Sequence, residues 1–132
     1  MATLKKRILV VDNEPAFAEL VKLTLEMSGH YDVQTETDAV RAVAAARAFR
    51  PDLILMDLVM PGRSGGLVAG QFKSEPVLEQ VPIVFMSAMV ARHERDTGER
   101  NIAGHPLLAK PVRAAELLGC VEKQLGPQVT AR

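Results

Sequence analysis

The chain has 132 residues, 48% hydrophobic and 24% charged, which suits a single folded domain with a substantial core. Its 16 lysines and arginines balance its 16 aspartates and glutamates, so bulk charge does not indicate nucleic-acid binding. No apolar run approaches the roughly 20 residues of a membrane span, and the basic start lacks a signal-peptide core, so we expect a cytoplasmic protein without membrane contact.

Five segments have the pattern of strands. Four are short, continuous apolar runs, which are typical of parallel strands buried on both faces of a sheet. The fifth, at 31–35, alternates apolar and polar residues. In chain order, the predicted strands are 8–11, 31–35, 53–56, 83–86 and 107–109.

Helical patterns alternate with these strands. Pro15 stands in the first turn of the first predicted helix, which Gly29 ends, and Asp38 can cap the second. The fourth pattern is mostly polar and contains Gly98, so we expect a marginal, mobile helix. Gly126 ends the last helix. The predicted helices after the first are 39–49, 67–73, 90–102 and 114–125.

This alternation predicts one α/β domain over residues 5–126, followed by a flexible tail at 127–132. Right-handed crossovers would place helices on both faces of the sheet. The single cysteine, Cys120, lies in an apolar helical pattern and is expected to be a buried thiol, and one cysteine excludes an internal disulfide. The histidines have no metal-ligand spacing and are expected at the surface: His30, His93 and His105.

Four predicted strands deliver a polar residue at or just past their carboxyl ends: Asp12, Asp57, Ser87 and Lys110. Ligands of open α/β sheets bind outside the carboxyl ends of the strands. Two carboxylates, a hydroxyl and an ammonium at one sheet edge can hold a divalent cation and a phosphoryl group. Taken singly, each has an ordinary explanation as a helix cap, a turn residue or a surface charge. Their occurrence at four strand ends favours a shared site.

The motifs around these residues identify a family. Ile8–Pro15 reads ILVVDNEP, and Asp57–Gly62 reads DLVMPG with Gly65 further on; Ser87-Ala88 and Lys110-Pro111 follow. In this order and spacing the chain resembles the receiver domains of two-component response regulators, of the chemotaxis response regulator type. The resemblance implies a flavodoxin-like three-layer sandwich with five helices, whose five-stranded parallel sheet has the order 2-1-3-4-5.

The resemblance also implies the chemistry. Asp57 would accept a phosphoryl group from a sensor histidine kinase or a histidine phosphotransfer protein, with Ser87 and Lys110 contacting its oxygens. Magnesium would be held by Asp57, Asn13 and the carbonyl of Val59, with Asp12 acting through water. The Lys110–Pro111 bond would be cis. The chain would catalyse only its own phosphoryl transfer and slow autodephosphorylation. It would signal to a downstream protein through the face built from 90–102, 107–109 and 114–125.

The sequence departs from the family pattern at several positions. Asn13 stands where a second acidic residue is usual; its amide oxygen can still ligate a cation, but the site loses one negative charge, so we expect weakened magnesium binding. Glu14 is an alternative source of that charge, but its side chain is expected to point elsewhere. Leu107 replaces an aromatic residue that takes part in switching, so the segment 90–102 is expected to transmit more of the signal. Val59 and Met89 are apolar where relatives tune hydrolysis, which predicts slow dephosphorylation.

Other functions remain as alternatives. A degenerate pseudo-receiver would bind proteins without phosphorylation; Asn13 and Leu107 favour it, whereas the intact Asp57, Ser87 and Lys110 oppose it. A haloacid-type phosphohydrolase needs an Asp-x-Asp motif, but Glu14 takes the second place here. Nucleotide binding would need a glycine-rich fingerprint after the first strand, which the sequence lacks.

Overall fold

The computed structural model describes residues 5–88, 101–102 and 104–126. Its strands form one sheet in the order β2-β1-β3-β4-β6-β5. They are β1 (Lys6–Val11), β2 (Tyr31–Glu36), β3 (Leu53–Asp57), β4 (Ile83–Ser87), β5 (Asn101–Ile102) and β6 (His105–Ala109). Strands β2, β1, β3, β4 and β6 are parallel, which confirms the predicted order because β6 is the fifth predicted strand.

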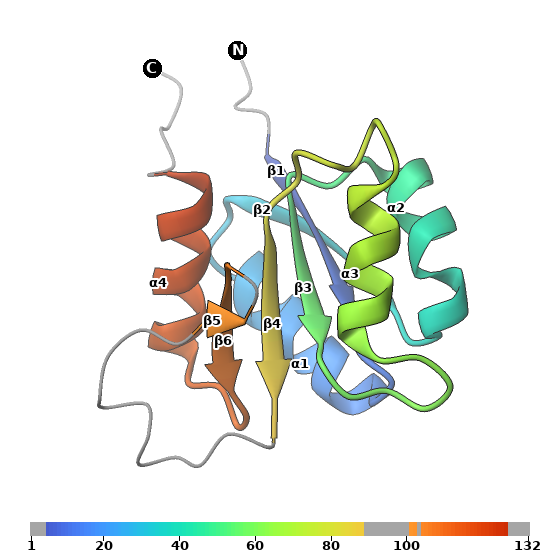
Figure 1. Ribbon diagram of the computed structural model, residues 1–132. Helices are drawn as coiled ribbons and strands as arrows, with labels where there is room; N and C mark the ends of the chain where they lie inside the picture. Colours follow the sequence, from blue (N-terminus) through green and yellow to red (C-terminus); the bar gives the residue numbers. More distant parts are fainter. Residues whose placement is uncertain (1–4, 89–100, 103, 127–132) are drawn as a thin grey trace.

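Helices cover both faces of this sheet. In Figure 1, α2 and α3 lie over one face, and α1 and α4 lie over the other. Within the described residues the helices are α1 (Pro15–Glu26), α2 (Ala42–Phe49), α3 (Gly65–Lys73) and α4 (Ala114–Leu125). None of them is long and apolar enough to cross a membrane.

Local sequence signals set the helix boundaries. Pro15 begins α1 as predicted. Asp38 accepts a hydrogen bond from the Val40 N–H, but the cap opens a 3-10 turn at Ala39–Arg41 that precedes α2. Helix α3 begins at Gly65, two residues earlier than predicted, because the Ser64 side chain caps it by accepting from the Leu67 N–H.

The predicted helix over 90–102 lies mostly outside the described residues. Its last two residues are described, and there the prediction is wrong: Asn101 and Ile102 form β5, which pairs antiparallel with β6. Gly104, at φ +84°, adopts the backbone conformation that lets the chain turn back between these two strands.

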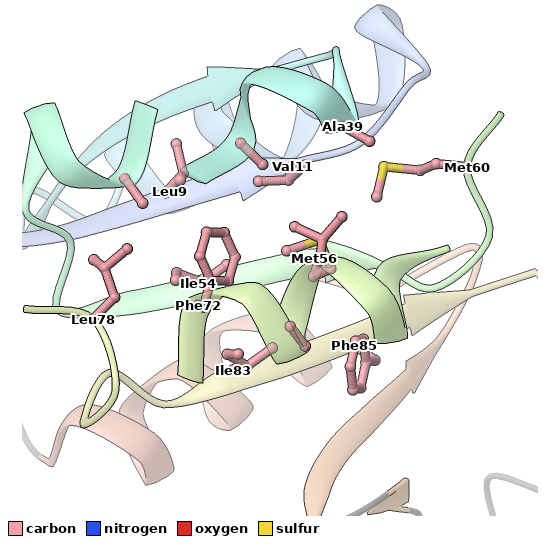
Figure 2. Close-up of a cluster of buried hydrophobic side chains, with 14 residues drawn as sticks. Leu9, Val11, Ala39, Ile54, Met56, Met60, Phe72, Leu78, Ile83 and Phe85 are labelled. Atoms are coloured by element: carbon pink, nitrogen blue, oxygen red, sulfur yellow. The ribbon is translucent and has the colours of Figure 1, made fainter. Parts of the chain in front are cut away.

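The strands bury residues on alternate sides, which divides the core in two. Ile8 and Val10 of β1 face the layer of α1 and α4, whereas Leu9 and Val11 face α2 and α3. Figure 2 shows the second cluster, in which Phe72 of α3 is fully buried among strand residues. Because both faces are covered by helices, the polar side chains of the central strands lie at the ends of the strands.

Candidate functional site

The four predicted residues meet at the carboxyl edge of the central strands. Asp12 follows β1, Asp57 ends β3, Ser87 ends β4, and Lys110 follows β6. These strands are neighbours in the sheet and point the same way (Figure 1). Among the described residues, the buried polar side chains are those of Asp12, Asp57 and Ser87, with 0%, 4% and 1% exposure. Buried polar groups are costly unless they are paired, so their concentration at one edge indicates a functional site.

Lys110 lies at the centre of this site. Its Nζ is 2.8 Å from Asp12 Oδ2, 3.0 Å from Glu14 Oε1 and 3.4 Å from Asp57 Oδ2. The ammonium also lies 4.4 Å from the centre of the Phe17 ring, a cation–π contact that α1 supplies. One ammonium therefore faces three carboxylates, which leaves an excess of two negative charges when all are ionised.

The loop after β1 is held by backbone hydrogen bonds. The Asp12 N–H donates to the Glu36 carbonyl of β2, and Asp12 Oδ1 accepts from the Glu14 N–H at 2.9 Å. The Glu14 carbonyl in turn accepts from the Ala18 N–H in the first turn of α1. These bonds fix the backbone of residues 12–14 against the sheet edge.

The electrostatic environment of Asp57 disfavours its ionised form. Burial raises the pKa of Asp57, and the nearby Asp12 carboxylate raises it further, while the Val59 N–H and the Lys110 ammonium oppose the shift. Asp57 Oδ1 accepts the Val59 N–H at 3.2 Å, which orients the carboxylate.

Lys110 remains charged despite its burial. Burial lowers the pKa of Lys110, but the contacts with Asp12 and Glu14 and the charge of Asp57 outweigh it, so the pKa lies above its usual value. The ammonium is therefore a fixed positive charge beside Asp57, suited to holding an anionic oxygen.

The acidic residues also fit a divalent cation. Single carboxylate oxygens of Asp12, Glu14 and Asp57 lie within 4.8 Å of one another. Asp12 Oδ2 is buried and makes no hydrogen bond, although it forms an ion pair with the Lys110 ammonium 2.8 Å away. An excess of negative charge and a carboxylate oxygen without a hydrogen bond are what a hard cation such as Mg²⁺ would satisfy.

Ser87 and Gly65 complete the edge. The Ser87 carbonyl accepts the Lys110 N–H at 2.9 Å, which ties the ends of β4 and β6 together. The Lys110–Pro111 peptide bond is cis, as the family resemblance implied. On the other side, the Gly65 N–H donates to the Leu58 carbonyl at 2.8 Å, which brings the start of α3 against the end of β3.

The structure brings Asp12, Asp57 and Lys110 into contact, whereas Asn13 is exposed in the same loop. The expectation that Glu14 points elsewhere is wrong, because its carboxylate reaches Lys110. No sequence pattern showed this, since Lys110 lies 96 positions away. The available signal for the placement of Glu14 was its position directly before Pro15, which makes it the residue that precedes α1.

The other candidate positions have clear placements. Val59 is 58% exposed next to Asp57, and Leu107 packs partly buried against the core layer of α2 and α3. Cys120 is half-buried in α4, and burial raises the pKa of its thiol, which agrees with a structural role. Met89 and His93 lie outside the described residues.

Comparison with known proteins agrees with this geometry. The model of the response regulator receiver domain family matches residues 8–122. The chain is 33% identical over 119 residues to the DNA-binding dual master transcriptional regulator RpaA of Synechocystis, covering 90% of this chain and 48% of that protein. It is 38% identical over 108 residues to the response regulator PleD of Caulobacter vibrioides, covering 80% of this chain and 23% of that protein. The chain thus spans half or less of these relatives.

Solved structures share the fold. The receiver domain of the sensor histidine kinase PA1611 from Pseudomonas aeruginosa superposes with a TM-score of 0.78 at 28% identity, over 94% of this chain and all of that one. That structure has a magnesium ion coordinated in its active-site cleft. The chemotaxis response regulator CheY4 of Vibrio cholerae superposes with a TM-score of 0.77 at 24% identity, over 92% of this chain and 99% of that one.

Proposed function

The chain belongs to the family of response regulator receiver domains, and from this premise we propose that it is a phosphorylation switch whose acceptor is Asp57. One observation carries the proposal: the buried polar side chains of the described residues gather where Lys110 meets Asp57. A structural role alone gives no reason to concentrate buried charge at this one edge.

The proposed reaction is a transfer of a phosphoryl group from a phosphohistidine to Asp57. A carboxylate oxygen of Asp57 attacks phosphorus, the phosphorus–nitrogen bond of the donor breaks, and its electron pair stays on the imidazole, which takes a proton from solvent. The product is an aspartyl phosphate. Asp57 must be ionised to attack, and the hydrogen bond from the Val59 N–H orients it.

Lys110 and Ser87 would stabilise the transferred group. Charge in the transition state is spread over the equatorial phosphoryl oxygens, so positioning and charge neutralisation supply most of the catalysis. The Lys110 ammonium, 3.4 Å from Asp57 Oδ2, is close enough to pair with one of those oxygens. The Ser87 hydroxyl, on the neighbouring strand, would donate to another.

Magnesium is the proposed cofactor, because the excess of negative charge and the Asp12 oxygen without a hydrogen bond suit a hard cation. Asp57 and the Val59 carbonyl would ligate it, with Asp12 acting through water. The loop after β1 offers one further oxygen donor, either the Asn13 amide or the Glu14 carboxylate. When bound, the ion would neutralise negative charge on the phosphoryl oxygens.

We expect the phosphorylated state to be long-lived. Val59 is exposed beside Asp57 and has no group that can orient an attacking water. Met89, the other position that flanks the site in relatives, is apolar as well. The chain would therefore catalyse its own phosphorylation and only slow autodephosphorylation, and act on no other substrate.

The proposed partners are a sensor histidine kinase or a histidine phosphotransfer protein, and a downstream protein. Three exposed apolar residues of α1 lie three and four positions apart and so share one helix face: Leu20, Leu23 and Met27. This face belongs to the helix whose first turn contacts Lys110 through Phe17, which supports docking of the phosphoryl donor there. The downstream contact is proposed for residues 90–102, β6 and α4, of which the first segment lies mostly outside the described residues.

Transfer from a donor tests this function. A histidine kinase, labelled by autophosphorylation with radioactive ATP, is mixed with the chain and with its Asp57→Ala variant. We expect label to move to the first and not to the second. The alternative, a pseudo-receiver that binds partners without phosphorylation, predicts that a kinase found to bind the chain transfers no label to it.

A further inference from the structure

We propose that Glu14, rather than Asn13, supplies the acidic oxygen that the magnesium site lacks by comparison with its family. This inference rests on the proposed function of the same site. Receivers usually carry an acid at the position of Asn13, and the amide found there brings no charge to a cation. The structure offers a carboxylate from the next residue instead.

The geometry favours Glu14. Its Oε1 lies 3.0 Å from Lys110 Nζ, and an oxygen of its carboxylate lies within 4.8 Å of oxygens from both Asp12 and Asp57. Independently of Glu14, the buried Asp12 Oδ2 makes no hydrogen bond, and its charge is met by the Lys110 ammonium at 2.8 Å, which Glu14 shares. Both observations point to a cation held between these carboxylates.

The backbone places Glu14 there while leaving its side chain free to turn. The Glu14 N–H donates to Asp12 Oδ1, and its carbonyl accepts from Ala18, so both sides of the residue are anchored. Glutamate is one methylene longer than aspartate, which extends its reach from this neighbouring position. The side chain is 63% exposed, so moving between Lys110 and a cation requires no repacking.

The charge balance supplies the reason for a switch of partners. In the present structure Glu14 pairs with Lys110. A divalent cation between the three carboxylates would repel the Lys110 ammonium and take the Glu14 carboxylate from it, because a hard cation prefers charged oxygen ligands. Phosphorylation would favour the same exchange, since Lys110 would then pair with a phosphoryl oxygen.

Calorimetric titration of the full chain with Mg²⁺ tests this assignment; calorimetry is suited because the chain has no tryptophan to report binding. Glu14→Ala and Asn13→Ala are compared with Glu19→Ala, which removes the same charge from an exposed position of α1. Helix α1 loses no capping bond in Glu14→Ala, because the Glu14 side chain makes none. We expect Glu14→Ala to weaken binding about tenfold or more, and the other two variants to stay within about twofold.

A second readout separates a direct ligand from an effect through Lys110. With Mn²⁺ as the probe, loss of a ligand admits a water to the ion, so the water-proton relaxation per bound Mn²⁺ should rise in Glu14→Ala. A lower affinity without this rise would overturn the inference, as would a loss of affinity in Asn13→Ala but not in Glu14→Ala.

The proposed function can fail separately. If the wild-type chain binds no Mg²⁺ and Asp57 is not phosphorylated, both the function and the inference are wrong. If Asp57 is phosphorylated and Glu14→Ala binds Mg²⁺ as tightly as the wild type, only the inference is wrong.

Discussion

Gly65 lies so close to the backbone of Asp57 that no side chain fits between them. A Cβ atom at residue 65 would stand 2.3 Å from the Asp57 carbonyl oxygen and 2.9 Å from Leu58 Cα. Both distances are far below van der Waals contact. The atoms that the Cβ would meet belong to the backbone, so they cannot move aside as a flexible side chain can. The start of α3 thus fixes the end of β3, where the phosphoryl acceptor lies.

We therefore predict that Gly65→Ala destabilises the protein by about 1–3 kcal/mol, the usual cost of overpacking. The variant should also accept phosphoryl groups more slowly, because the end of β3 must shift. Urea unfolding and the rate of labelling by acetyl phosphate measure the two effects.

Gly70→Ala is the matched control. Gly70 lies inside the same helix, and a Cβ there meets nothing within 4 Å. Alanine should stabilise an exposed helix interior by up to about 1 kcal/mol relative to glycine. Equal stabilities for the two variants would contradict the close approach of Gly65 and Asp57.

Asp57→Asn should raise the free energy of unfolding at neutral pH. Burial and Asp12 raise the pKa of Asp57 above its ordinary value of 3.8. A carboxyl group whose pKa is raised on folding stabilises the folded state while it is protonated. Asp57 therefore contributes stability below pH 3.8, and this contribution is lost as the pH rises through its pKa in the folded protein. Asparagine does not ionise, so the variant's advantage should be largest at neutral pH and shrink in acid. Urea unfolding of both proteins along a pH series measures this difference in unfolding free energy. A difference that grew in acid would contradict the prediction.

His105 should make stability depend on pH in the opposite sense. Its pKa is lowered from 6.5, mainly by burial and also by Lys73, and its ring packs edge-on against Phe85. The unfolded chain then binds the proton more readily, so protonation favours unfolding. From about pH 8 to about pH 5.5 the wild type should lose stability relative to His105→Leu. Urea unfolding of both proteins measures this loss. If their free energies of unfolding changed with pH in parallel, the prediction would be refuted.

Val59→Asn should shorten the lifetime of the phosphorylated state. An amide beside Asp57 can orient an attacking water, which valine cannot, so we expect hydrolysis at least about tenfold faster. The loss of phosphorylated protein is followed by intact mass. Val77→Asn, the same change at another exposed valine, should leave the rate unaltered. If the two variants behaved alike, Val59 would not control hydrolysis.

The strands and the meeting of Asp12, Asp57, Ser87 and Lys110 were predictable because the apolar runs were continuous and each ended in a polar residue. In a parallel sheet, such strand ends share one edge. The sequence pattern therefore predicted the position of the site as well as the fold.

Features that depend on distant residues were not predictable in this way. The direction of the Glu14 side chain is set by Lys110, which reaches the site only after folding. The strand character of Asn101 and Ile102 comes from pairing with β6, whereas their local sequence continues a helical pattern. In both cases a tertiary contact decided what the local sequence left open.

Intact-protein mass after incubation with acetyl phosphate and Mg²⁺, beside an Asp57→Ala control, tests the central claim most directly. We predict one added phosphoryl group that hydroxylamine removes, as expected of an acyl phosphate, and none in the control. An unchanged mass at high Mg²⁺ concentration, or an adduct that persists in Asp57→Ala, would contradict the assignment of Asp57 as the phosphoryl acceptor.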